Sequence, residues 1–194
     1  MPCAKHFPGH GDTDLDSHLA LPRVQHDRAR VDRVELAPFR AVLPDVPFVM
    51  TAHVVFDALD PGVPASLSKA ILQDLLRDQM GFDGAVISDD LAMKAIAGKM
   101  GIGEAACRAI DAGCDALLLR SKWELVVEAQ EALVHRSEDD GAFRARLSDA
   151  ATRFLDARRS TPPRPVLERE KLDAILQSQE ATEISLDLVR RTRR

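Results

Sequence analysis

The sequence predicts an α/β fold built on a parallel β-sheet, and three observations support this prediction. Short apolar runs rich in valine, isoleucine and leucine alternate with longer amphipathic segments over most of the chain. Glycine and proline residues separate these segments, as they do at the turns between strands and helices. Conspicuous polar side chains come directly after the apolar runs, at the strand ends where parallel sheets place their active sites.

Four strands are expected, each followed by a polar loop or a helical pattern. Leu72, Leu75 and Leu76 recur at helical spacing, and Gly113 stands where a C-cap glycine would end a later helix. The strands are expected at 2–4 (the end of a strand), 47–55 (a strand with its exit loop), 84–88 and 115–119, and the helices at 67–80, 102–112, 123–135 and 142–159.

The chain is expected to form one main folded unit with an appended tail. Of its 194 residues, 45% are hydrophobic and 29% are charged, which is typical of soluble globular proteins. The main unit is expected at 1–159. A Pro-rich linker follows at 160–165, and a charged tail that is helical or partly disordered occupies 166–194.

Charge and cysteine content exclude several classes of protein. The net charge of -5 argues against nucleic-acid binding, and the basic residues 190–194 are interpreted as a solvated end. The absence of an apolar run of about 18 residues argues against a membrane span, and neither a membrane partner nor a secretory signal is expected. The odd cysteine set of Cys3, Cys107 and Cys114 argues against a disulfide framework, so we expect a cytoplasmic protein.

A polar loop near the N-terminus is the densest cluster of reactive side chains. The run from Lys5 to His18 contains three histidines and three aspartates around a proline and two glycines. Such a composition disfavours regular structure and suits a loop that presents side chains to a ligand. His53, the Asp89-Asp90 pair and Arg120 follow the other three strands, so the sheet should bring all of them to one edge.

Three motifs, taken together and in order, resemble the family 3 glycoside hydrolases. They are Lys5-His6-Phe7-Pro8-Gly9-His10-Gly11 with Asp16-Ser17-His18, then Met50-Thr51-Ala52-His53, then Ile87-Ser88-Asp89-Asp90-Leu91. Within that family the motifs are most similar to the bacterial β-N-acetylglucosaminidases (β-hexosaminidases) that remove amino sugars from cell-wall muropeptides. The resemblance covers about residues 3–120.

The resemblance implies a retaining mechanism with a covalent glycosyl-aspartate intermediate. Asp89 matches the nucleophile, and His18 held by Asp16 matches the acid/base dyad of this family. A carboxylate beside a histidine orients the ring and favours its protonated form, which suits proton donation near neutral pH. No cofactor is implied.

The resemblance also implies how the substrate is held. Lys5 and His6 match residues that bind the sugar, and His10 and His53 are expected to line the site. The expected substrate is a muropeptide or a chito-oligosaccharide that carries a terminal N-acetyl-β-D-glucosamine.

Other interpretations of the same residues stay open. Asp89 and Asp90 are also typical of a helix N-terminus, and His18 of a surface loop. A metal site would draw on His6, His10, Asp12, Asp16 and His18, but their spacing matches no standard zinc pattern and no metal is expected. The EF-hand pattern fails because Ser17 and Arg23 occupy the positions that require glycine and glutamate.

The family's catalytic domain is a TIM-type (β/α)8 barrel, so this chain is expected to form a half barrel. About strands five to eight, with C-terminal helices, would be present, and the aspartate and arginine that the family supplies from the first half have no counterpart here. A half barrel leaves two open strand edges, and we expect self-association through them. An inactive fragment with an interaction or structural role is therefore the alternative function. A different α/β hydrolase that uses Asp89 with a metal is a more remote one.

Overall fold

The computed structural model describes residues 2–13, 21–120, 122–160, 162 and 166–192. The chain divides into two compact units, Met1–Thr161 and Pro162–Arg194, which are described separately below.

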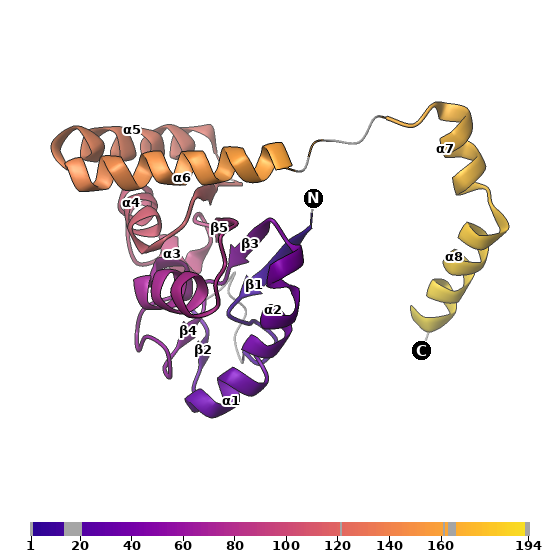
Figure 1. The fold of residues 1–194 in the computed structure, drawn as a ribbon, viewed down its shortest axis with the longest axis horizontal. Coiled ribbons are helices and arrows are strands. Elements are labelled where there is room, and N and C mark those ends of the chain that lie inside the picture. The colour runs from indigo at the N-terminus through magenta and orange to yellow at the C-terminus, as the bar shows by residue number, and fades with distance from the viewer. Residues whose placement is uncertain (1, 14–20, 121, 161, 163–165, 193–194) are drawn as a thin grey trace. The chain divides into compact units, whose positions relative to one another are not determined.

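The first unit is organised by a four-stranded sheet in which every neighbouring pair is parallel (Figure 1). Its order is β1-β3-β5-β6, with strands β1 (Cys3–Phe7), β3 (Phe48–Thr51), β5 (Ala85–Asp90) and β6 (Ala116–Leu118). The predicted α/β class and its four parallel strands are thus confirmed. Strand β1 runs further than the stub expected at 2–4, so Lys5 and His6 belong to a strand rather than to the loop.

A second, two-stranded parallel sheet pairs β2 (Arg23–Val24) with β4 (Val55–Phe56). Between β2 and β3 in the sequence, the chain forms the short helices α1 (Arg28–Arg33) and α2 (Leu36–Val42). Neither helix was predicted. The Asp27 carboxylate caps α1 by accepting a 2.7 Å hydrogen bond from the Arg30 N–H. Leu36 and Phe39 bury the inner face of α2. These helices are too short for a helical repeat to stand out in the sequence.

The longer helices follow the predicted pattern more closely. The helix expected at 67–80 is formed by η2 (Ala65–Leu67) and η3 (Ala70–Gln79). Helix η3 is a π-helix, and just past its end the Met80 N–H still reaches five residues back to the Leu75 carbonyl at 2.9 Å. The remaining helices of this unit are η1 (Leu43–Asp45), α3 (Lys94–Ala97), α4 (Ile102–Ala112), α5 (Trp123–Asp139) and α6 (Gly141–Ser160).

Gly113 ends α4 as expected. Its φ of 126° lies in the region that favours glycine, and a Cβ there would lie 3.1 Å from the Cβ of Leu72. Helices α5 and α6 then pack side by side (Figure 1).

A buried ion-pair network lies where β5 and β6 begin, at the amino ends of these strands. The Asp115 carboxylate accepts hydrogen bonds from Arg77 at 2.5 Å, from Arg146 at 2.8 Å and from the Val86 N–H at 2.8 Å. Arg77 also donates to the carbonyls of Phe82 and Gly84, the residues that lead into β5. Because each buried charge is paired and hydrogen-bonded, the network fixes where β5 begins relative to β6.

The second unit contains α7 (Arg169–Leu176) and α8 (Gln179–Thr192). Its large apolar side chains are exposed, among them Val166, Leu172, Ile175, Leu176, Ile184 and Leu188. In neither unit do the described residues form a helix that is both long and apolar enough to cross a lipid bilayer.

Candidate active site

Asp89 lies at the carboxyl end of β5, the second-last residue of the strand. The buried residues Ala85 and Val86 anchor the strand in the core, while the Asp89 side chain is 15% exposed. The Asp89 N–H donates to Thr51 Oγ1 at 3.3 Å, and Asp89 Oδ1 accepts from the Asp90 N–H at 2.8 Å. These contacts hold one carboxylate oxygen in place, and Oδ2 is the oxygen that faces His6.

Asp90 organises the backbone that surrounds Asp89. Its Oδ1 accepts from the Ala92 N–H at 3.0 Å and from the Arg120 N–H at 3.2 Å. The alternative interpretation of Asp90 as a capping residue is therefore close to what the structure shows, although the capped groups belong to loops rather than to a helix. Helix α3 begins only at Lys94.

His6, a predicted binding residue, lies beside Asp89. Its Nε2 lies 4.0 Å from Asp89 Oδ2, and its ring packs edge-on against His10 with the centroids 5.9 Å apart. Burial lowers the pKa of His6, Asp89 opposes that shift, and the nearby Lys5 and His10 add to it. The lowered pKa favours the neutral form of the imidazole, which both donates and accepts hydrogen bonds.

His53 is fully buried and has protein partners on both ring nitrogens. Nε2 lies 3.0 Å from the Asp90 carbonyl oxygen, and Nδ1 lies 2.7 Å from Ser66 Oγ. Because a carbonyl only accepts, Nε2 carries the proton and Nδ1 accepts from the serine hydroxyl. Burial also lowers the pKa of His53. The structure therefore places His53 beneath the site, where it supports Asp90, and not on the lining where it was expected.

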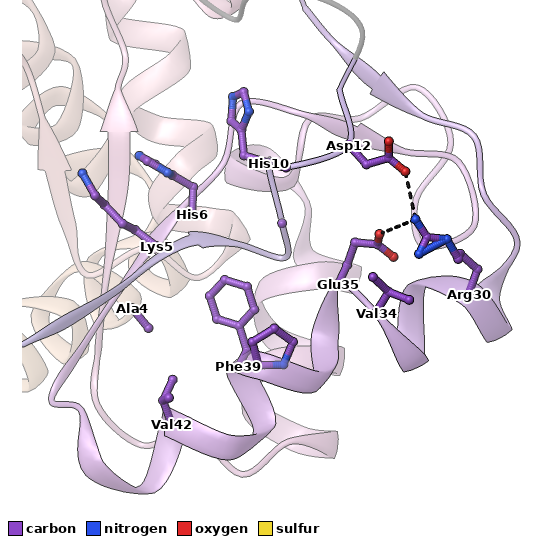
Figure 2. A pocket seen from close by; sticks show the side chains of 13 residues that line it. Ala4, Lys5, His6, His10, Asp12, Arg30, Val34, Glu35, Phe39 and Val42 are labelled. Atoms are coloured by element: carbon purple, nitrogen blue, oxygen red, sulfur yellow. Dashed lines mark hydrogen bonds and ion pairs between the residues drawn. The ribbon is translucent and has the colours of Figure 1, made fainter. Parts of the chain in front are cut away.

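A pocket of about 640 Å³ opens beside residues 8–13, which follow β1 and which we call the histidine loop (Figure 2). Lys5, His6 and His10 line one part of it, and Phe39 and Val42 of α2 form an apolar wall. His6 connects the predicted residues, since it lies beside Asp89 and packs against His10, whereas Asp89 is not among the residues that line this pocket. Asp16 and His18 lie outside the described residues.

A chain of charged side chains ties the histidine loop to α1 and α2, and sequence reasoning missed it. Asp12 Oδ2 accepts a hydrogen bond from His26 Nε2 at 2.5 Å. It also accepts one from Arg30 Nη2 at 3.0 Å, and Arg30 lies 3.5 Å from Glu35 Oε1 (Figure 2). We call these four residues the loop clamp. Gly9 packs directly on it, since a Cβ at Gly9 would lie 3.2 Å from the Cβ and Cγ of Glu35.

Two further observations concern the possible ligands of the site. Among the described residues, Glu35 Oε2 is the buried side-chain oxygen or nitrogen atom without a hydrogen-bond partner. Within that same part of the chain, no group of three or more His, Cys, Asp or Glu side chains is arranged to hold a metal ion.

The fold and the site define a segment of a TIM-type barrel, with a carboxylate and imidazoles at the carboxyl ends of its parallel strands. Comparison with known proteins agrees. Residues 1–157 match the model of the glycosyl hydrolase family 3 N terminal domain, and the chain belongs to that family.

Curated relatives and solved structures carry related names. The chain is 45% identical over 123 residues to a protein of Alkalilimnicola ehrlichii named Beta-hexosaminidase, which covers 63% of this chain and 35% of the relative. It is 39% identical over 143 residues to a Beta-hexosaminidase of Neisseria gonorrhoeae, covering 73% of this chain and 39% of the relative. The chain therefore spans little more than a third of these relatives' length.

Among solved structures, a family 3 β-N-acetylglucosaminidase from a Paenibacillus strain superposes with a TM-score of 0.77 at 41% identity, covering 86% of this chain and 33% of that one. Native NagZ from Neisseria gonorrhoeae superposes with a TM-score of 0.62 at 33% identity, covering 92% of this chain and 47% of that one.

Proposed function

We propose that this chain carries the reacting groups of a β-N-acetylglucosaminidase, an enzyme that hydrolyses terminal non-reducing N-acetyl-β-D-glucosamine from its glycosides. The observation that carries the proposal is the geometry at Asp89. One carboxylate oxygen is held by the Asp90 N–H, and the other faces His6 at 4.0 Å. The names of the relatives and structural neighbours support the same activity.

In the proposed first step, Asp89 Oδ2 attacks the anomeric carbon and the bond from that carbon to the leaving oxygen breaks. The leaving oxygen takes a proton from His18, which Asp16 orients, and a glycosyl-aspartate remains. In the second step His18 takes a proton from water, the water oxygen attacks the anomeric carbon, and Asp89 leaves as a carboxylate. Two inversions at one carbon retain its configuration.

The remaining site residues serve binding and positioning. Lys5, His6 and His10 face the pocket and would hold sugar hydroxyls, since ammonium and imidazole groups supply the donors that hydroxyl oxygens accept. His53 is assigned a positioning role, because it contacts the Asp90 carbonyl and has no exposed surface.

We extend the proposal to muropeptide-type glycosides as substrates and to the cytoplasm as the location. The structural similarity to NagZ is consistent with the first. All three cysteines are free, which suits a reducing compartment.

The alternative function is that of an inactive fragment with an interaction or structural role, and one observation favours it. Strands β1 and β6 are the edges of the described four-stranded sheet, and exposed strand edges pair readily with other chains.

The test is the turnover of a chromogenic N-acetyl-β-D-glucosaminide by the purified chain and by its Asp89→Asn and His18→Ala variants. We expect His18→Ala to lower kcat by about 10²–10⁴-fold, the usual contribution of a general acid, and Asp89→Asn to lower it at least as much. His135→Ala, which changes an 81% exposed side chain near the C-terminal end of α5, is the control and should retain activity. Equal activity in all variants would refute the site, and a wild-type chain without activity would favour the inactive fragment.

A further inference from the structure

His53 has a partner that lies in none of the three sequence motifs, the hydroxyl of Ser66. Both side chains are fully buried, and Ser66 Oγ lies 2.7 Å from His53 Nδ1. The Ser66 N–H donates to the Ala52 carbonyl at 3.1 Å. One residue earlier, the Ala65 N–H donates to the Val54 carbonyl at 2.9 Å. Because Ala52 and Val54 flank His53 in the sequence, these backbone bonds hold the hydroxyl beside the ring.

Through the His53 ring, the serine hydroxyl is connected to the strand that carries Asp89. His53 Nε2 donates to the Asp90 carbonyl at 3.0 Å, so Nδ1 of the neutral ring accepts from the Ser66 hydroxyl. The partner of one ring nitrogen fixes which nitrogen carries the proton. Without this donor a buried acceptor would be left unpaired, and a ring that turned to find another partner would lose its bond to Asp90. Ser66 therefore fixes both the tautomer and the orientation of His53.

The segment at the end of β3 contacts the Asp89-Asp90 pair at two points. The Thr51 hydroxyl accepts from the Asp89 N–H at 3.3 Å, and His53 donates to the Asp90 carbonyl. The position of the Asp89 carboxylate therefore depends on a ring that the serine holds. We infer that Ser66 is a positioning residue, which acts through His53 to hold Asp89 where its Oδ2 can reach the anomeric carbon. This inference rests on the function proposed above.

Ser68 provides a matched control in the same segment. It is a serine of nearly equal burial, 1% exposed, but its hydroxyl donates to Asp60 Oδ2 at 2.6 Å and accepts from the Ile71 N–H at 3.1 Å. Ser68→Ala therefore removes a buried hydroxyl and leaves His53 its partner. A loss of stability should be common to Ser66→Ala and Ser68→Ala, whereas an effect on His53 should be specific to Ser66→Ala.

The first measurement needs no turnover. Heteronuclear NMR of the histidine rings in the full chain, above neutral pH, shows which nitrogen carries the proton and whether the other accepts a hydrogen bond. We expect His53 Nδ1 to resonate as a hydrogen-bonded, unprotonated nitrogen in the wild type and in Ser68→Ala. In Ser66→Ala the signal should shift towards that of a nitrogen without a hydrogen bond. Its loss in His53→Gln assigns it.

The second measurement is turnover of a chromogenic N-acetyl-β-D-glucosaminide, at a temperature where the unfolding curves show every variant to be folded. We expect Ser66→Ala to lower kcat about tenfold with little change in KM, since a displacement of about 1 Å at a reacting group can cost about 10²-fold. Ser66→Thr keeps the hydroxyl and should recover part of the loss. Ser68→Ala should keep kcat close to that of the wild type.

The outcomes separate this inference from the proposed function. With an active wild type, an unshifted His53 signal in Ser66→Ala would overturn the positioning role and leave the proposed function standing. Equal kcat values in Ser66→Ala and Ser68→Ala would do the same. A wild-type chain without turnover would overturn both.

Discussion

At the scale of single residues, His6 and His53, which lie beside Asp89 and Asp90 respectively, share one property. Burial lowers the pKa of both His6 and His53, so each binds a proton less readily in the folded state than in the unfolded chain. The unfolded state therefore takes up more protons as the pH falls below about 6.5, the ordinary value for histidine. Linkage then requires the free energy of unfolding to rise with pH across that range and to decrease on acidification.

We predict that the urea midpoint falls as the pH is lowered from 7.5 to 5, and that His53→Gln flattens this dependence. One proton contributes at most about 1.4 kcal/mol per pH unit, so the slope rather than the absolute stability is the quantity to compare. His135→Gln is the control, because its side chain is 81% exposed near the C-terminal end of α5. A His53→Gln slope equal to that of the wild type would contradict the prediction.

At the scale of elements, the loop clamp connects the histidine loop to the start of α1. Asp12 lies in the loop, His26 precedes the helix, and Arg30 lies within it. Hydrogen bonds from His26 and Arg30 lower the pKa of Asp12, the His26 bond more than the other, so the carboxylate stays ionised.

We predict that Asp12→Asn raises the hydrogen-exchange rate of the amides at Gly9–Thr13 and leaves the strands of the main sheet unaffected. Asp57→Asn is the matched control, since it removes another partly exposed pair, with Arg23 at 2.7 Å, without touching the loop. Unchanged exchange at Gly9–Thr13 would show that the clamp does not hold the loop.

The same scale explains which elements the sequence could predict. Helix α4 combines a clear apolar repeat with a glycine at its end, so both its type and its boundaries were predictable. Strand β1 was underestimated because it is an edge strand whose Lys5 and His6 are polar. Asp89, Lys5 and His6 could be predicted as site residues because each lies in a short, contiguous sequence motif. The loop clamp was not predictable, since Asp12 and Glu35 come together only in the folded chain.

At the scale of the whole molecule, the open sheet edges matter most. Among the described residues, β1 has a hydrogen-bonded neighbour only in β3, and β6 only in β5. Such edges favour association unless charge or a covering segment prevents it.

We predict that the chain sediments as a concentration-dependent oligomer under reducing conditions. Cys3→Lys, which puts a charge at the exposed start of β1, should shift it towards the monomer. Val134→Lys adds the same charge on α5, away from either edge, and should not. A chain that is monomeric at every concentration would rule out the edges as an interface.

The adjacent residues Asp89 and Asp90 have different tasks, and this affects how mutational data should be interpreted. Asp90 accepts hydrogen bonds from two backbone N–H groups through its side chain and from His53 through its carbonyl, whereas Asp89 Oδ2 lies 4.0 Å from His6 Nε2. If the proposed function holds, removal of either carboxylate should lower the measured activity. An added small anion such as azide, which replaces a missing nucleophile but cannot rebuild a loop, would tell the two losses apart.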